Sequence, residues 1–134
     1  MKLTDLNPQF LKHAKGIAGE DHGRTLPDGT TQWGGFEIDE FHYVDSFAEA
    51  HGIKFLCPVS FTKNGGAAGT HSVHVYFTGS PVPDGIGMND KGETVRWGAS
   101  GTGYADLTLT PSILEQLGAP CWHGYVTNGE VSIL

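Results

Sequence analysis

Hydrophobic and polar residues alternate in two stretches near the middle of the chain. One runs from Ile53 to Phe61 and the other from Val73 to Phe77. Alternation at every second position is typical of a β-strand with one buried face. Residues 62–70 between them hold three glycines and read as a loop. The pattern therefore predicts an antiparallel hairpin.

A second hairpin is predicted at the C-terminus. Asn128-Gly129 is a strong two-residue turn signal. The flanking residues 121–127 and 130–134 would form its two strands.

The region before that hairpin predicts a strand followed by a helix. Residues 105–110 alternate as in a strand, and residues 94–97 suggest a shorter one. Pro111 is expected to end the longer strand. Residues 112–117 then predict a short helix with Gly118 in the C-terminal cap position.

The N-terminal part is polar and rich in glycine. Residues 1–30 predict an irregular arm, with one or two helical turns within residues 8–15. Residues 33–44 suggest a strand, and residues 45–50 a short helix that ends at Gly52.

Composition supports a small β-rich fold. The chain has 134 residues, of which 20 are glycine and 17% are charged. This length suits one domain, and many glycines with few charges favour short strands joined by turns. We expect a mainly β (α+β) fold: a single domain over residues 1–134, made of antiparallel hairpins with one or two short helices.

Charge and hydropathy exclude several classes of partner. The net charge is −7 with only eight Lys and Arg residues, which argues against nucleic-acid binding. No apolar stretch approaches the roughly 18 residues of a membrane span, and no signal region is seen at the N-terminus. Cys57 and Cys121 are expected to stay reduced. The sequence thus predicts a cytoplasmic protein.

Ser112 and His123 are the main candidates for catalytic chemistry. A serine nucleophile needs a base within hydrogen-bond reach, and that base needs an orienting partner. Ser112 would lie at a strand-to-helix junction, and His123 could return to the same edge of the fold. His71 and Asp106 are the candidate orienting partners.

A structural role for Ser112 is the alternative. Ser112-x-x-Glu115 matches a capping box, in which the serine hydroxyl accepts a hydrogen bond from the main-chain N–H three residues on. Capping and catalysis would compete for the same hydroxyl.

A zinc site is a second possible chemistry. Cys57, His71 and His123, with Cys121 as a further candidate, could hold Zn²⁺ and leave one position for water. If the first hairpin is symmetric about its loop, Cys57 faces Val75 and lies about 13 Å from His71, too far to share a metal. Histidines and cysteines of this kind are also commonly structural residues.

Several motifs resemble a family of short phage and prophage proteins that look related to the BubE peptidase-like proteins of bacterial ubiquitination-like operons. The similarity covers about residues 50–134 and is most specific at Thr110-Pro111-Ser112-Ile113 and Trp122-His123-Gly124. The matching elements are Cys57-Pro58, Asn64-Gly65-Gly66, Gly69-Thr70-His71, Arg96-Trp97, Ser100 to Gly103, Asp106 to Ile113 and Cys121 to Gly129.

The resemblance implies a deubiquitinase-like serine peptidase in a phage-infected or lysogenic host. Ser112 would be its nucleophile and His123 its base, and His71 falls on the Gly-Thr-His position of the phage group. The operon members tend to carry a cysteine cluster after the first Cys-Pro, where this chain has only Cys57. We therefore expect a hydrolase of peptides or proteins, with a ubiquitin-like target as one candidate substrate. A zinc hydrolase and a non-enzymatic phage accessory protein are the alternatives.

Overall fold

The structure is a computed structural model that describes residues 1–18, 24–32, 36–116 and 122–134. The chain forms two compact units. One comprises Met1–Lys12 and Tyr43–Leu134, and the other comprises His13–His42.

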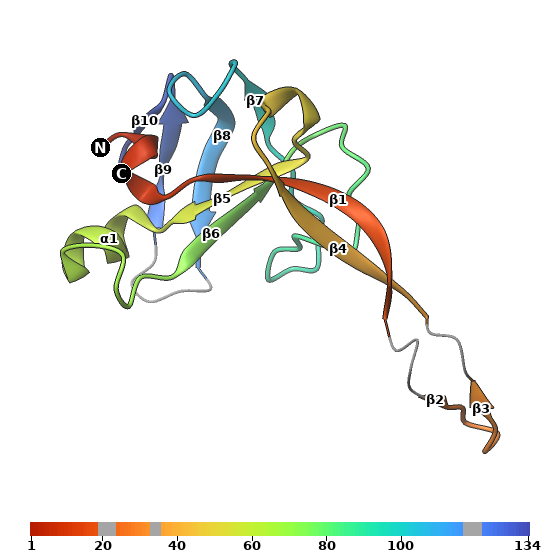
Figure 1. Ribbon diagram of the computed structural model, residues 1–134. Helices are drawn as coiled ribbons and strands as arrows, with labels where there is room; N and C mark the ends of the chain where they lie inside the picture. Colours follow the sequence, from red (N-terminus) through yellow and green to blue (C-terminus); the bar gives the residue numbers. More distant parts are fainter. Residues whose placement is uncertain (19–23, 33–35, 117–121) are drawn as a thin grey trace. The chain divides into compact units, whose positions relative to one another are not determined.

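Antiparallel strands dominate both units (Figure 1). The strand orders are β4-β1-β5-β6 in one sheet, β10-β9-β8-β7 in a second, and β2-β3 in a small third sheet. The first sheet contains β1 (Gln9–Ala18), β4 (Phe36–Val44), β5 (Gly52–Leu56) and β6 (Ser72–Tyr76). The second contains β7 (Gly98–Ser100), β8 (Thr108–Glu115), β9 (Trp122–Thr127) and β10 (Glu130–Val131). The third pairs β2 (Arg24–Thr25) with β3 (Thr31–Gln32).

Helical structure is short. Over the described residues it consists of α1 (Pro58–Asn64) and the 3₁₀ turns η1 (Leu3–Leu6) and η2 (Phe47–Glu49). The predicted mainly β fold of antiparallel hairpins with short helical segments is confirmed. Within the part of the chain that the structure describes, no helix is long and apolar enough to cross a membrane.

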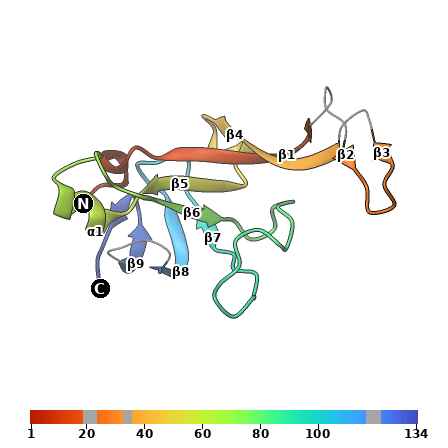
Figure 2. The same ribbon diagram turned by 90° about the horizontal axis from the view of Figure 1, so that it is seen from below.

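The core of the larger unit lies between the inner faces of β5 and β6 and those of β8 and β9 (Figure 2). The rings of Phe55 and Trp122, one from each sheet, lie 5.8 Å apart in an edge-on arrangement. Alternation along β9 is complete, with every second residue from Trp122 buried. Leu3 and Leu6 of η1 are also fully buried, so the N-terminal turn belongs to this core.

The C-terminal hairpin forms around the predicted turn, although its second strand, β10, ends at Val131 and not at Leu134. β9 and β10 pair in register across Asn128-Gly129. Both turn residues have positive φ, 50° and 76°, the conformation that a two-residue hairpin turn requires.

The first hairpin differs from its prediction. β5 ends at Leu56, and Pro58 occupies the first turn of α1, where its missing N–H costs no hydrogen bond. Gly65 closes the helix in the left-handed conformation. The alternation that seemed to continue to Phe61 therefore belongs to a helix, and the segment 62–70 is partly helical.

This helix shifts the pairing of the hairpin. Ile53 pairs with Val75 and Phe55 with Val73, and the Cys57 N–H donates to the His71 carbonyl at 2.9 Å. The expectation that Cys57 faces Val75 is wrong. Cys57 instead lies opposite His71.

The helix predicted from Ser112 is also wrong where the structure describes it. β8 continues through Ser112 to Glu115, with a register shift against β9 between Leu109 and Ile113. Pro111 lies within this irregularity, beyond the end of β7, where its lack of an N–H leaves no ladder position empty. Leu117 and Gly118 lie outside the described residues.

The N-terminal predictions are only partly correct. The arm over residues 1–30 is not irregular, because η1, β1 and β2 lie within it, and the helix expected at residues 8–15 is part of β1. The strand predicted at 33–44 appears as β4, and the helix at 45–50 as η2. Residues 33–35 lie outside the described residues. Instead of a strand at 94–97, isolated bridges join Thr94 to Met88 and Trp97 to Phe77.

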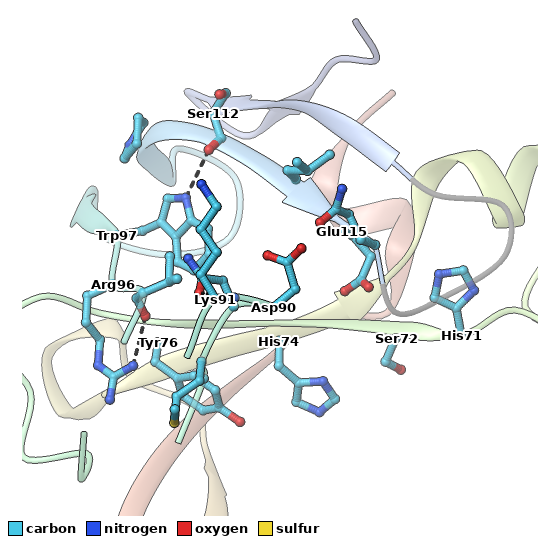
Figure 3. Close-up of a pocket in the computed structure, with 17 residues that line it drawn as sticks. His71, Ser72, His74, Tyr76, Asp90, Lys91, Arg96, Trp97, Ser112 and Glu115 are labelled. Atoms are coloured by element: carbon cyan, nitrogen blue, oxygen red, sulfur yellow. Dashed lines mark hydrogen bonds between the residues drawn. The ribbon is translucent and has the colours of Figure 1, made fainter. Parts of the chain in front are cut away.

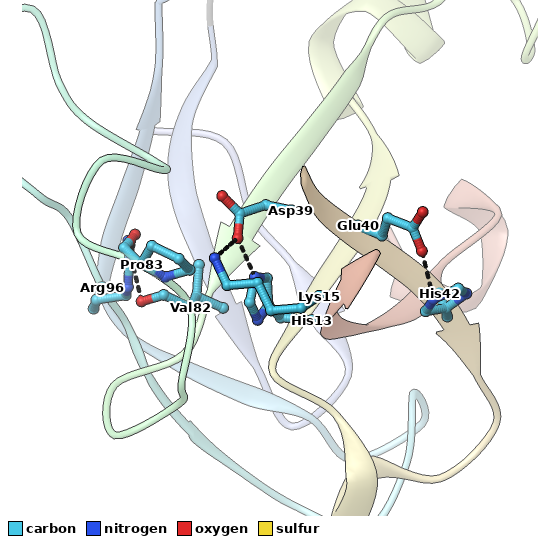
Figure 4. Close-up of polar contacts among 8 residues, drawn as sticks. All are labelled: His13, Lys15, Asp39, Glu40, His42, Val82, Pro83 and Arg96. Carbon is cyan, nitrogen blue, oxygen red and sulfur yellow. Dashed lines mark hydrogen bonds and ion pairs between the residues drawn. The ribbon is translucent and has the colours of Figure 1, made fainter. Parts of the chain in front are cut away.

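The smaller unit carries its own polar cluster (Figure 4). Asp39 Oδ1 lies 2.8 Å from both His13 Nε2 and Lys15 Nζ. The hydrogen bond from Lys15, followed by that from His13, holds the pKa of the Asp39 carboxyl below its usual value. His42 and Glu40 form a looser pair at 3.4 Å.

Two hydrogen bonds to β9 hold the C-terminal segment in place. Trp122 Nε1 donates to the Ser132 carbonyl at 3.0 Å, and the Leu134 N–H donates to the His123 carbonyl at 2.8 Å. A Cβ atom on Gly124 would collide with the Ser132 carbonyl oxygen. Trp122 and Gly124, the first and third residues of the Trp-His-Gly motif, thus have a structural role in packing the C-terminal segment.

We expect Gly124→Ala to destabilise the protein by about 1–3 kcal/mol, because the added methyl group must displace main-chain atoms. Gly85→Ala is the control, since a Cβ there meets nothing within 4 Å. Its effect should stay within about 1 kcal/mol. Urea unfolding measures both, and equal stability of the two variants would contradict the close approach.

Candidate functional site

Ser112 and His123 lie within hydrogen-bond reach of each other. The Ser112 Oγ and the His123 Nε2 are 3.2 Å apart. The hydroxyl can donate to Nε2 when that nitrogen carries no proton. The contact expected between these two residues is therefore present.

The register of β8 against β9 produces this contact. Leu114 lies directly opposite His123, which makes Ser112 and His123 diagonal neighbours on one face of the sheet. Ile113 and Trp122 point to the other face and are buried. The burial of these two side chains turns the serine and the histidine outward.

Large apolar side chains are exposed at positions that neighbour the pair in the sheet. Leu114 is 52% exposed, Tyr125 44% and Leu134 68%. Leu134 belongs to the C-terminal segment that pairs alongside His123. The pair thus lies on a solvent-accessible and partly apolar surface.

The capping role proposed for Ser112 is wrong, because no helix begins there. Its hydroxyl contacts His123, and its carbonyl accepts a hydrogen bond from Trp97 Nε1 at 3.2 Å. In Figure 3 the carbonyl points to Trp97 and the hydroxyl lies on the opposite side of the residue.

Asp106 has a different set of partners from the one expected. Its carboxylate accepts hydrogen bonds from Thr102 N, Thr102 Oγ1 and Gly103 N, each at 2.9 Å. These bonds, with that from the Thr102 N–H the largest influence, hold its pKa below the usual value. The structure places Asp106 as the organiser of the loop before β8 and does not bring it to a histidine.

His71 is also separate from the Ser112–His123 pair. Figure 3 shows it well apart from Ser112, with Asp90 and Glu115 between them. Its Nε2 atom is buried and has no hydrogen-bond partner among the residues that the structure describes. The structure therefore does not bring His71 into the role of an orienting partner.

The residues of the zinc alternative are dispersed. Cys57 is fully buried in the core, next to His71 in the β5–β6 pairing, whereas His123 is exposed on the outer face of the second sheet. Among the described residues no three His, Cys, Asp or Glu side chains are grouped as metal ligands. Cys121 lies outside the described residues.

A large groove lies between β6 and β8 (Figure 3). Its volume is about 990 Å³. The main chain of Ser112 lies at its rim, and the remaining walls come from β6, the end of β8 and the segment 87–97. Its charged or titratable side chains are His71, His74, Tyr76, Asp90, Lys91, Arg96 and Glu115.

Arg96 shapes one wall of this groove. Its guanidinium donates to the carbonyls of Ile86 at 2.8 Å and Pro83 at 2.9 Å, as Figure 4 shows for Pro83. It also lies over the Tyr76 ring, 5.7 Å from the centroid. Arg96 thus holds the loop against the end of β6.

Sequence reasoning missed this groove. His74 was not among the candidate site residues, and residues 94–97 were expected only to form a short strand. The usable signal was that Ser72, His74 and Tyr76 alternate with the two buried valines of β6 and therefore share the face or edge away from the core. Burial, with a smaller contribution from Lys54, lowers the pKa of His74, and Glu115 opposes this shift.

No protein-family description, curated protein or solved structure matches this sequence. The resemblance to the phage and BubE-related proteins stays a prediction. The function is therefore inferred from the geometry of the site.

We expect Asp106→Asn to lower stability at neutral pH and to matter less in acid. A carboxylate with a lowered pKa stabilises the folded state above its unfolded pKa, near 3.8, and loses this effect as the pH falls through the folded value. Urea unfolding of both proteins at pH 7, 5 and 3 checks this. A stability difference that does not change with pH would show that the charge of Asp106 is unimportant.

Proposed function

We propose that this protein is a serine-type hydrolase of peptide or isopeptide bonds, with Ser112 as nucleophile and His123 as base. The observation that carries the proposal is the 3.2 Å separation of Ser112 Oγ and His123 Nε2. This is close to the range in which a base removes a proton directly. The same two residues occupy the most specific motifs of the resemblance.

The chemistry follows from this dyad. His123 Nε2 takes the hydroxyl proton while Ser112 Oγ bonds to the substrate carbonyl carbon. The C–N bond then breaks, His123 returns the proton to the leaving amine, and an acyl ester remains on Ser112. A water molecule, deprotonated by His123, then attacks the ester carbonyl carbon. The bond from that carbon to Ser112 Oγ breaks, His123 returns the proton to Oγ, and the acid leaves.

The outer face offers a surface for the substrate. Leu114, Tyr125 and Leu134 occupy positions next to the dyad and are exposed enough to pack against an apolar substrate side chain. The His123 carbonyl points toward the C-terminal segment and therefore away from β8. Leu114 lies directly opposite His123, so its N–H points away from β9, toward the open edge of β8. That N–H is the candidate donor to the oxyanion.

The substrate class comes from the resemblance. Relatives of peptidase-like proteins in ubiquitination-like operons would act on peptide or isopeptide bonds at the end of a ubiquitin-like protein. A ubiquitin-like conjugate is therefore a substrate to assay beside unfolded casein.

We expect a fluorophosphonate probe to label the wild-type protein and not Ser112→Ala. Casein hydrolysis should disappear in Ser112→Ala and fall at least about 100-fold in His123→Gln, because general-base catalysis is lost. Ser100→Ala and His42→Gln are the controls. They change a serine and a histidine outside the dyad and should keep full labelling and activity.

Thermal unfolding separates this effect from misfolding. Ser112→Ala should unfold within about 0.5 kcal/mol of wild type, since its hydroxyl is on the surface and caps no helix. Activity that survives in Ser112→Ala, or that a zinc chelator abolishes, would contradict the dyad, and loss with a chelator would favour the zinc alternative.

A further inference from the structure

The first sheet ends in a strand with an open edge. In the described ranges 1–18, 24–32, 36–116 and 122–134, the order β4-β1-β5-β6 leaves β6 with a neighbouring strand on only one side. The His71 carbonyl accepts from Cys57, and the Phe77 N–H donates to the His51 carbonyl, both at 2.9 Å. The main-chain N–H and C=O groups of the odd-numbered residues from His71 to Phe77 therefore point toward β5. Because hydrogen-bonding direction alternates along an antiparallel strand, the N–H and C=O groups of Ser72 and His74 point away from β5.

A contact of Trp97 confirms this alternation. The Trp97 N–H donates to the Tyr76 carbonyl at 3.0 Å, on the side away from β5. Trp97 thereby covers the C-terminal end of the β6 edge. Among the described residues, no hydrogen bond satisfies the outward N–H and C=O groups of Ser72 and His74.

These unpaired groups lie in the groove. Ser72 and His74 line it along β6, as Figure 3 shows, and the opposite wall comes from the end of β8. The N–H and C=O groups of two alternate residues repeat at about 7 Å along a strand. This is the spacing at which a second extended main chain presents its own hydrogen-bonding groups.

The other groups of the groove also suit a polypeptide. The carboxylates of Asp90 and Glu115 and the ammonium group of Lys91 line it together, so it offers both signs of charge. A polyanion would meet the two carboxylates and a chain of net charge −7. At the end of the β6 wall, the buried Nε2 atom of His71 is a further polar atom, with no hydrogen-bond partner in the described part of the chain.

We propose that this groove binds an extended peptide segment, which pairs with Ser72 and His74 as an additional strand of the first sheet. The bound segment would satisfy the open main-chain groups of β6 and fill the groove beside β8. This binding goes beyond the proposed hydrolysis and does not require a reactive Ser112.

The test uses peptides of random sequence. A library of twelve-residue peptides displayed on phage is selected on the full-length Ser112→Ala protein, so that no peptide is cleaved. Enriched peptides are synthesised with a fluorophore, and their Kd is measured by fluorescence anisotropy.

Two variants at one position test the edge. His74→Pro removes the outward N–H but no hydrogen bond to β5, and proline is tolerated at such an edge position. His74→Ala removes the side chain and keeps the N–H. We expect His74→Pro to weaken binding at least about tenfold and His74→Ala to change it less than about threefold. Thermal unfolding verifies that both variants are folded.

Peptides modified on the main chain keep the test decisive if His74→Pro does not fold. N-methylation at successive positions should weaken binding to the unaltered edge only at every second position, where the peptide N–H pairs with β6. Equal binding by His74→Pro and His74→Ala, no alternation in the methylated series, or no enriched peptide would overturn the proposal. Because every binding measurement uses Ser112→Ala, these outcomes are independent of whether wild-type protein hydrolyses casein.

Discussion

The pairing of β8 with β9 is the interaction on which both the core and the candidate site depend. Ile113 and Trp122 are buried against the first sheet, and Trp122 also holds the C-terminal segment through the Ser132 carbonyl. Since successive side chains of a strand alternate between its faces, burial of these two residues exposes Ser112 and His123 on the outer face. A shift of one residue in this register would place the serine and histidine in the core.

The proposed hydrolysis and the proposed peptide binding use opposite sides of β8 around Ser112. The hydroxyl of Ser112 lies on the outer face of the second sheet, while its main chain lines the rim of the groove beside β6. Trp97 connects the two, because its main chain pairs with Tyr76 and its indole donates to the Ser112 carbonyl. A chain bound along β6 would therefore lie in the groove whose rim contains the main chain of Ser112, while the hydroxyl stays on the outer face.

Two errors of the sequence prediction fall where two local signals compete. Pro58 follows an alternating stretch yet begins a helix, and Pro111 precedes a capping-box pattern yet lies within a strand. Around Ser112 the capping signal was worth about 1 kcal/mol, less than the burial of Ile113 against the core. Tertiary packing therefore decided which signal prevailed.

The sequence by itself determined the mainly β fold and the hairpin at Asn128-Gly129, because turn chemistry and strand alternation are local properties. Side-chain chemistry and the resemblance made Ser112 and His123 candidates. Only the tertiary structure decided that these two residues meet, that Asp106 binds its own loop, and that Cys57 lies opposite His71. It also left the edge of β6 open. These outcomes depend on register and on which strand has no neighbour, and both are fixed by contacts between residues far apart in the sequence.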